Sequence, residues 1–164
     1  MTGHVVVTRW GTQFMGRRFA SVVGRGGITG AKREGDGATP AGVRRIVGML
    51  YRPDRMLRPA DWAVPIGPSD LWSDDPRDRD YNHMVRAPHD YSHERLHRAD
   101  PMYDLILLTD WNWPHAEPGR GSAIFLHRWR RPGVGTAGCV AMAAADLLWI
   151  AQRLQPRHRV IVQR

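Results

Sequence analysis

The chain has one cysteine, Cys139, which lies in the segment SAIFLHRWRRPGVGTAGCVAM at residues 122–142. In the same segment His127 ends an apolar run, and a turn rich in Pro and Gly separates it from Gly138 and Cys139. A thiol beside an imidazole can give its proton to the ring and attack a carbonyl carbon, and the ring can later protonate a leaving amine. These residue types and their order predict a Cys–His acyl-transfer site, with Cys139 as the nucleophile and His127 as its base.

The turn that carries Cys139 has features that suit this chemistry. Backbone N–H groups in a Gly-Cys turn, and the N-terminus of a helix expected a few residues later, favour nearby negative charge. We therefore expect a lowered thiol pKa and two oxyanion donors, the N–H groups of Gly138 and Cys139. Gly138 also leaves room for a carbonyl substrate to approach the backbone. The alternative is that Cys139 packs as a small apolar residue and His127 bonds to a backbone carbonyl, but a Gly-rich turn is an unusual place for an inert side chain.

A second pattern, HERLH at residues 93–97, has the spacing of a zinc motif. Two histidines four residues apart on a helix, with a glutamate beside the first, bind zinc and supply a general base in many metalloproteases. The flanking sequences APHDYS and RADP leave room for only about two helical turns. A third ligand is not evident, since His115 lies in a loop beside Pro114. We expect a short surface helix capped by Ser92 rather than a metal site, and no cofactor.

The elements that position these residues are mostly strands, because the apolar runs are short and rich in β-branched residues. Residues 4–10 and 17–24 are expected to form a hairpin, residues 103–111 and 122–129 two paired central strands, and residues 43–52 and 159–163 two further strands. One segment, 143–154, has the apolar spacing of a helix, with Pro156 beyond its end and an apolar face of Leu147, Leu148, Ile150, Ala151 and Leu154. The predicted fold class is mainly β with one main C-terminal α-helix, in a single domain over residues 1–164.

Two long loops separate these elements. Residues 24–42, GRGGITGAKREGDGATPAG, contain seven glycines and a Thr-Pro pair, a composition that no regular element tolerates. Residues 53–101 are rich in proline and in charged pairs. Loops of this length in a small domain usually line a site or form a lid, so we expect long active-site loops.

Composition limits the partners. The formal net charge is +8, and of 24 basic residues only Lys32 is a lysine. Arginine favours carboxylates and phosphates, although a GC-rich genome gives the same count. The arginines are spread among 16 acidic residues without a basic face, so we expect no nucleic-acid partner. We also expect no transmembrane segment, no classical secretory signal in the N-terminal MTGHVVVTRW and no internal disulfide, and the sequence carries no signal for an oligomeric state.

The Cys–His segment also resembles a known family. FLH at residues 125–127, followed by TAGCVAM at 136–142, resembles the active-site signature of the L,D-transpeptidase catalytic domain, the YkuD-like family. In that signature a histidine ends a strand and a Ser/Thr-x-Gly-Cys turn carries the nucleophile. KREGDGATPAG at residues 32–42 is similar to the Gly-rich, Thr-Pro-Gly loop near the start of that domain. The resemblance covers about residues 4 to 163 and implies a β-sandwich with few helices.

The resemblance implies a substrate and a mechanism. The partners would be peptidoglycan stem peptides, as donor and as acceptor. The cysteine attacks the carbonyl of the diamino acid at stem position three, releases the terminal D-alanine, and passes the acyl group to an amine of a second stem, which gives a 3→3 cross-link. Carried over to this chain, Cys139 is the nucleophile, His127 the base, Gly138 and Cys139 the oxyanion donors, and Thr136 shapes the turn.

Some positions depart from the family pattern. Many members have His before the Gly-Cys pair and Arg two positions after the cysteine, where this chain has Ala137 and Ala141, and Arg128 follows the histidine where a small residue is common. Arg128, Arg130 or Arg131 can supply a guanidinium for a substrate carboxylate, or all three are simply solvated.

A further loop segment offers candidates for substrate contact. In RDRDYNHMVRAP, residues 77–88, we select Tyr81, Asn82 and His83. An Asn side chain can donate and accept along a peptide backbone, although an Asn in a turn usually bonds its own chain.

Three functions remain open at this level. The first is a cysteine acyltransferase on wall peptides, the second a cysteine hydrolase with the same residues, and the third a catalytically silent wall-binding module, which the altered positions 137 and 141 favour. Location in the cell envelope or periplasm follows from the resemblance, whereas the N-terminal sequence favours the cytoplasm as the alternative.

Overall fold

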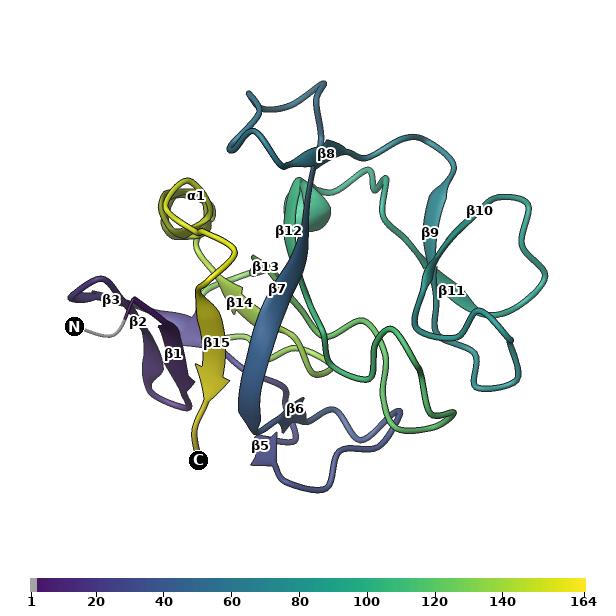
Figure 1. Ribbon diagram of the computed structural model, residues 1–164, viewed down its shortest axis with the longest axis horizontal. Helices are drawn as coiled ribbons and strands as arrows, with labels where there is room; N and C mark the ends of the chain where they lie inside the picture. Colours follow the sequence, from purple (N-terminus) through teal and green to yellow (C-terminus); the bar gives the residue numbers. More distant parts are fainter. Residues whose placement is uncertain (1–2) are drawn as a thin grey trace.

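The computed structural model describes residues 3–164 and is organised around one large sheet (Figure 1). Ten strands belong to it. Nine follow one another by hydrogen bonding and the tenth, β8, pairs with β7 alone. In sheet order they are β3 (Arg17–Phe19), β2 (Gly11–Phe14), β1 (Val5–Thr8), β15 (Arg159–Val162), β7 (Gly42–Tyr51), β12 (Leu105–Thr109), β13 (Phe125–Arg128), β14 (Val140–Met142) and β4 (Ser21–Val22), with β8 at Val64–Pro65.

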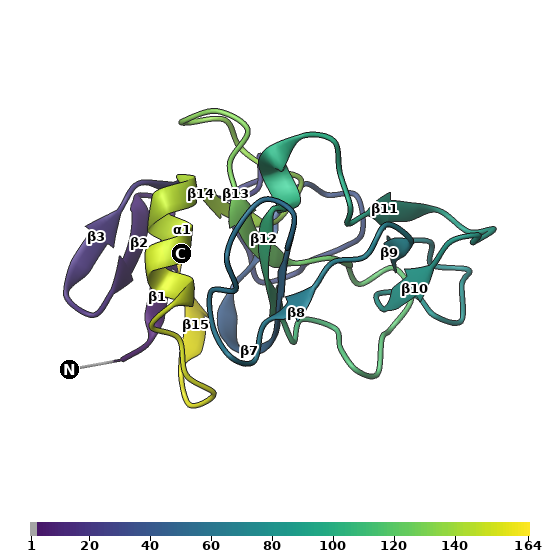
Figure 2. The same cartoon turned by 90° about the horizontal axis from the view of Figure 1, so that it is seen from above.

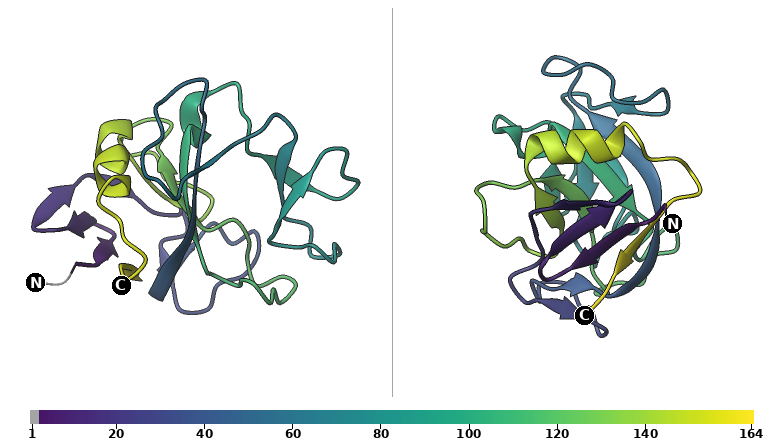
Figure 3. Two further views of the ribbon diagram at one scale, coloured as in Figure 1. Left: turned by 45° about the horizontal axis from the view of Figure 1, so that its top comes forward. Right: turned by 90° about the vertical axis from the view of Figure 1, so that its left-hand side faces the viewer.

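The sheet curls until its two ends almost meet. β3 and β4 are the end strands, yet a single residue separates them in the chain. Across this gap the Thr12 hydroxyl on β2 hydrogen-bonds to the Ser21 hydroxyl on β4 at 2.7 Å. The mainly β prediction is confirmed, whereas the sandwich is not, because one sheet that nearly closes has a barrel-like form (Figure 3).

Most predicted strands of the large sheet are present, but β2, β8 and β14 were not predicted. The runs at 4–10, 43–52, 103–111, 122–129 and 159–163 correspond to β1, β7, β12, β13 and β15, and β12 pairs antiparallel with β13 as expected. The segment at 17–24 divides into β3 and β4, and the hairpin expected between 4–10 and 17–24 is wrong, because β2 lies between β1 and β3. β2 lies in residues taken for a turn, since GTQF has little apolar character, and β14 is only three residues long before the helix begins. The predicted helix is α1 (Ala144–Ala151).

The core occupies both faces of the sheet. All five residues of β12 are buried, and they alternate between two apolar clusters. Leu105 and Leu107 join the cluster that α1 covers with Leu147, Ile150 and Ala151 (Figure 2). Ile106 and Leu108 join a second cluster on the opposite face, against which Cys139 packs. Side chains alternate along a strand, so successive residues of β12 contact different clusters. The candidate site lies on the face of the sheet opposite α1.

The long segment 53–101, expected to be a loop, contains a second sheet. Its three strands, in sheet order, are β10 (Met84–Arg86), β9 (Asp70–Ser73) and β11 (His93–Arg95). It lies beside the large sheet, on the side opposite β1 to β3 (Figure 1). The helix expected at residues 93–97 is therefore wrong, since His93–Arg95 pairs antiparallel with β9.

Smaller elements complete the part of the chain that the structure describes. The Gly-rich segment 24–42 is mostly loop, as expected, with two short paired strands, β5 (Ile28–Thr29) and β6 (Thr39–Pro40). A single 3-10 turn, η1 (Pro101–Tyr103), precedes β12 and is capped by Asp100. Among residues 3–164, the helices are too short or too polar to cross a bilayer.

Candidate active site

Cys139 and His127 lie on the same face of the large sheet. β13 and β14 are parallel, with Leu126 in register with Val140. Cys139, just before Val140, therefore lies beside Phe125, whose N–H points to the sulfur at 3.4 Å. His127 is two residues further along β13, and side chains two apart in a strand share a face. The sheet register thus brings the predicted nucleophile and base to one surface, where both line the same cavity.

The His127 ring is held in one orientation. Its side chain is buried, and its Nδ1–H donates to the carbonyl oxygen of Arg128 at 2.6 Å. The ring of Tyr103 packs edge-to-face against it, with centroids 5.3 Å apart. Because the carbonyl can only accept, Nδ1 carries the proton and Nε2 keeps its lone pair. Burial lowers the pKa of His127 from 6.5 to about 4, so the ring is a neutral base at physiological pH.

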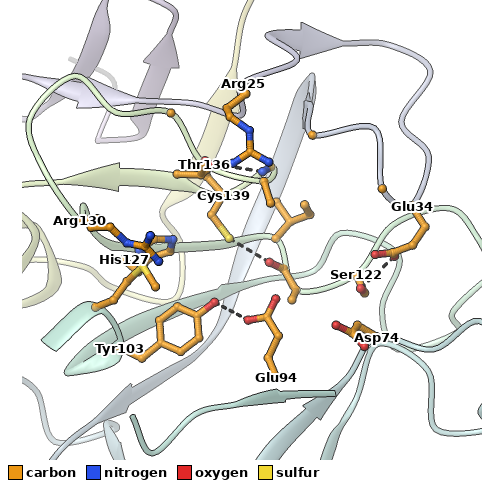
Figure 4. Close-up of a pocket in the computed structure, with 18 of the residues that line it drawn as sticks. Arg25, Glu34, Asp74, Glu94, Tyr103, Ser122, His127, Arg130, Thr136 and Cys139 are labelled. Atoms are coloured by element: carbon orange, nitrogen blue, oxygen red, sulfur yellow. Dashed lines mark hydrogen bonds between the residues drawn. The ribbon is translucent and has the colours of Figure 1, made fainter. Parts of the chain in front are cut away.

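The Cys139 thiol is partly buried and protonated. It donates to the carbonyl oxygen of Ala123 at 3.0 Å, the bond that Figure 4 draws from the sulfur. Burial raises the pKa of Cys139 to about 12, and the Glu94 carboxylate adds to this effect. The expected low thiol pKa is wrong for this state, because burial and the Glu94 charge outweigh the hydrogen bond from the Phe125 N–H and the charge of Lys32, which lower the pKa. The free protein therefore holds a neutral thiol beside a neutral imidazole.

The turn before Cys139 is held by side-chain bonds. The Thr136 hydroxyl donates to the carbonyl oxygen of Cys139 at 2.6 Å and accepts from the Gly138 N–H at 3.0 Å. The Thr136 side chain therefore connects both ends of the Gly138–Cys139 pair. The Gly138 N–H is already occupied, so of the two predicted oxyanion donors only the Cys139 N–H is free of a bond within the turn.

The Gly-rich loop, residues 24–42, stabilises this turn through the side chain of Thr39. Thr39 accepts from the Gly24 N–H at 2.8 Å and donates to the carbonyl oxygen of Gly138 at 2.7 Å. Gly138 has φ +145, and a Cβ there would lie 3.0 Å from the carbonyl oxygen of Ala38. The glycine is thus required both by its backbone conformation and by the close approach of the loop.

Cys139 lines a cavity of about 560 Å³ that contains charges of both signs. In Figure 4 the carboxylates of Glu34, Asp74 and Glu94 lie on one side of the sulfur, and Arg25 and Arg130 lie on the other. Lys32 and Arg98 also line the cavity. The loop 24–42 and the segment 53–101 both contribute to the lining, as expected for active-site loops.

Glu94 is the functional candidate that the sequence analysis missed. It lies in the HERLH segment, where the Tyr103 hydroxyl donates to its Oε2 atom at 2.5 Å. Burial raises the pKa of Glu94, which the Tyr103 bond opposes and the Asp74 carboxylate assists. A strand interpretation would have found it, because Glu94 is two residues before the fully buried Leu96 and so faces the same side.

The HERLH residues do not form the face that a zinc motif requires. His93 lies in a strand, and its Nδ1 bonds to the carbonyl oxygen of Tyr91 at 2.7 Å. Among residues 3–164, no three His, Cys, Asp or Glu side chains come together as a metal-binding group would.

The structure places the predicted substrate-contacting residues at different distances from the cavity. Thr136 lines it, whereas Arg128, Tyr81, Asn82 and His83 do not. Arg128 is exposed at the end of β13. The backbone of the same strand continues into the loop where Arg130 does line the cavity, so the guanidinium expected from this arginine group is best placed at position 130.

Tyr81 and Asn82 are buried, and each accepts a hydrogen bond from a backbone N–H in the segment that precedes β13. Asn82 accepts from the Ala123 N–H at 2.9 Å and the Trp72 indole N–H at 3.0 Å. Tyr81 accepts from the Gly121 N–H at 3.0 Å and donates to Glu34. His83 bonds to the carbonyl oxygen of Tyr81. The carbonyl oxygen of Ala123 in turn accepts a hydrogen bond from the Cys139 thiol. Tyr81, Asn82 and His83 therefore support the segment that contacts the nucleophile and do not line the cavity.

The family model of the L,D-transpeptidase catalytic domain, YkuD, matches residues 4–162. This chain belongs to the YkuD family. The family consists of L,D-transpeptidases, which act on peptidoglycan peptides. A search of curated proteins finds no match.

Two of the three positions that the sequence analysis singled out as departures from the YkuD pattern have different environments. Ala137 is exposed and lines the cavity. Ala141 is fully buried in β14, in register with His127. A side chain at position 137 can therefore face a ligand in the cavity, whereas one at position 141 cannot.

Proposed function

We propose that this YkuD domain is a cysteine acyltransferase that acts on peptidoglycan stem peptides through a thioester on Cys139. The observation that carries the proposal is the shared face of Cys139 and His127, with the Nδ1 proton of the ring fixed on the Arg128 carbonyl. That bond leaves Nε2 as the atom that can take the thiol proton.

The first half-reaction transfers the acyl group to sulfur. The donor carbonyl lies over the turn, Nε2 of His127 accepts the thiol proton, and the sulfur attacks the carbonyl carbon. The oxygen gains negative charge close to the Cys139 N–H. His127 then gives its proton to the leaving nitrogen, so that D-alanine departs and a thioester remains.

The second half-reaction restores the free enzyme. The amine of a second stem attacks the thioester carbon and loses a proton to Nε2 of His127. The C–S bond breaks, the proton returns to the sulfur, and the product is a 3→3 cross-link. We place this reaction in the cell envelope, where mature stem peptides lie.

One observation favours a second candidate, the catalytically silent wall-binding module. The free thiol is neutral, with a pKa of about 12, and a thiolate is the stronger nucleophile. We favour the enzyme because a neutral Cys–His pair transfers its proton as the bond to carbon forms, so that no free thiolate is needed beforehand.

Product analysis with a disaccharide-tetrapeptide tests the proposal. An acyltransferase releases D-alanine and forms cross-linked dimers when the peptide also serves as acceptor. A hydrolase with the same residues releases D-alanine but gives only the tripeptide, with or without an added amine. A folded protein that binds the peptide and releases no D-alanine is the silent module.

A further inference from the structure

Glu94 enters the cavity in a position that the acyl-transfer mechanism does not use. Its Oε2 atom accepts from the Tyr103 hydroxyl, and the Tyr103 ring packs against the ring of His127. The carboxylate is therefore held by a group that is itself in contact with the predicted base. Figure 4 shows it between Tyr103 and Asp74, with the Cys139 sulfur above it.

The carboxylates of Glu34, Asp74 and Glu94 form one wall of the cavity, and the charge of Arg98 acts on Glu94 without a direct ion pair. Within residues 3–164, none of the three cavity carboxylates of Glu34, Asp74 and Glu94 forms an ion pair. The nearby cations are already engaged, since Lys32 pairs with Asp36 and Arg98 pairs with Asp100.

The wall also contains an unsatisfied acceptor. Glu34 accepts hydrogen bonds from Tyr81 and Ser122. Asp74, in contrast, has a buried Oδ1 atom without a hydrogen-bond partner in the part of the chain that the structure describes. A buried acceptor of this kind is costly unless a donor reaches it, so the wall is suited to a ligand that brings both positive charge and N–H groups.

An organic ammonium fits this wall better than a metal ion does. No three acidic, His or Cys side chains of residues 3–164 come close enough to hold a metal. A primary ammonium has three N–H donors and can reach separated acceptors. On the opposite side Arg25 and Arg130 form no ion pair within the same residues.

We infer that Glu94, with Asp74 beside it, binds a primary ammonium group of a stem peptide and so selects the substrates of this cavity. The inference rests on the proposed function for its substrate class. The ammonium is that of the diamino acid side chain of the donor, because the acceptor amine must be neutral when it attacks the thioester. The bound positive charge offsets the Glu94 charge that opposes ionisation of Cys139.

The test compares peptides with a free and with an N-acetylated side-chain amine, on wild type and Glu94→Gln. A Gln keeps the size of the side chain and can still accept from Tyr103, but it carries no charge. Glu117→Gln is the matched control, since Glu117 is exposed and outside the cavity. Both peptides serve as donors, and the experiment measures the rate at which each forms the thioester.

We expect wild type and Glu117→Gln to form the thioester about ten-fold faster from the ammonium-bearing donor than from the acetylated donor, the value of a hydrogen bond to a charged group. Glu94→Gln should lose this preference, so that the ratio of its rates with the two donors falls to about one.

An unchanged preference of Glu94→Gln for the ammonium-bearing donor would overturn the inference while leaving the proposed function intact. If wild type forms no thioester, the proposed function is wrong, and calorimetry with the same two peptides decides the inference by itself. Equal affinity of wild type and Glu94→Gln for the free-amine peptide would then overturn it.

Discussion

The hydroxyl of Thr39 donates to the carbonyl oxygen of Gly138 at 2.7 Å, across 99 positions of the chain. The same hydroxyl accepts from the Gly24 N–H. A single buried side chain thus joins the Gly-rich loop to the turn that carries the nucleophile. The two segments that resemble the family signature are therefore parts of one structural unit.

Thr39→Val tests this connection. Valine has nearly the shape of threonine but leaves the Gly24 N–H and the Gly138 carbonyl without their partner, so we expect a loss of about 1–3 kcal/mol in the free energy of unfolding. Urea denaturation measures it. Because the turn also loosens, turnover of the tetrapeptide should fall with it.

Thr29→Val is the control for this substitution. Thr29 lies in the same loop, but its hydroxyl accepts only the local Ala31 N–H. An equal loss in the free energy of unfolding for Thr29→Val and Thr39→Val would contradict a stabilising role of the Thr39–Gly138 hydrogen bond.

The pH dependence of stability follows from the burial of His127. Its pKa is about 4 in the folded protein against 6.5 for a solvated ring. Protonation therefore favours the unfolded chain. The contribution of the neutral ring to the free energy of unfolding is complete above pH 6.5 and is lost as the pH falls toward 4. The difference corresponds to about 3 kcal/mol.

Unfolding by urea at a series of pH values checks this expectation. His127→Gln, which cannot take up the proton, should lose less stability than wild type between neutral and acid pH. His115→Gln, at an exposed loop position, should follow the wild-type curve. Parallel curves for wild type and His127→Gln would contradict the neutral, buried ring.

Much of this arrangement was predictable from the sequence. Cys139 and His127 stand out because a lone thiol and an imidazole flank a Gly-rich turn, and the apolar run of β13 places the histidine on a central strand. The sheet pairing of residues 103–111 with 122–129 followed from the same runs, since such runs favour paired strands.

Other features depend on contacts that the sequence does not reveal. Glu94 was missed because its spacing to the two histidines suggested a helix, whereas pairing with β9 makes the segment a strand. The pKa of Cys139 was expected to be low from its local turn, but burial and the Glu94 charge, contributed by a strand far away in the chain, raise it. Tertiary contacts decided both outcomes.

Glu94 should also control the reactivity of the free thiol. Its carboxylate raises the pKa of Cys139, so Glu94→Gln should lower that pKa and speed alkylation by iodoacetamide several-fold at a fixed pH near neutrality. The reaction is followed by intact mass in the absence of peptide. Glu117→Gln should react at the wild-type rate. Slower alkylation in Glu94→Gln would mean that the carboxylate promotes rather than opposes ionisation.

The central claim is that the Cys139 sulfur becomes acylated by a stem peptide. Intact-protein mass spectrometry after incubation with a disaccharide-tetrapeptide tests it most directly, with Cys139→Ala as the matched protein. We expect wild type to gain the mass of the peptide less D-alanine, and folded Cys139→Ala to gain nothing. An equal adduct on Cys139→Ala, or none on folded wild type, would contradict the account.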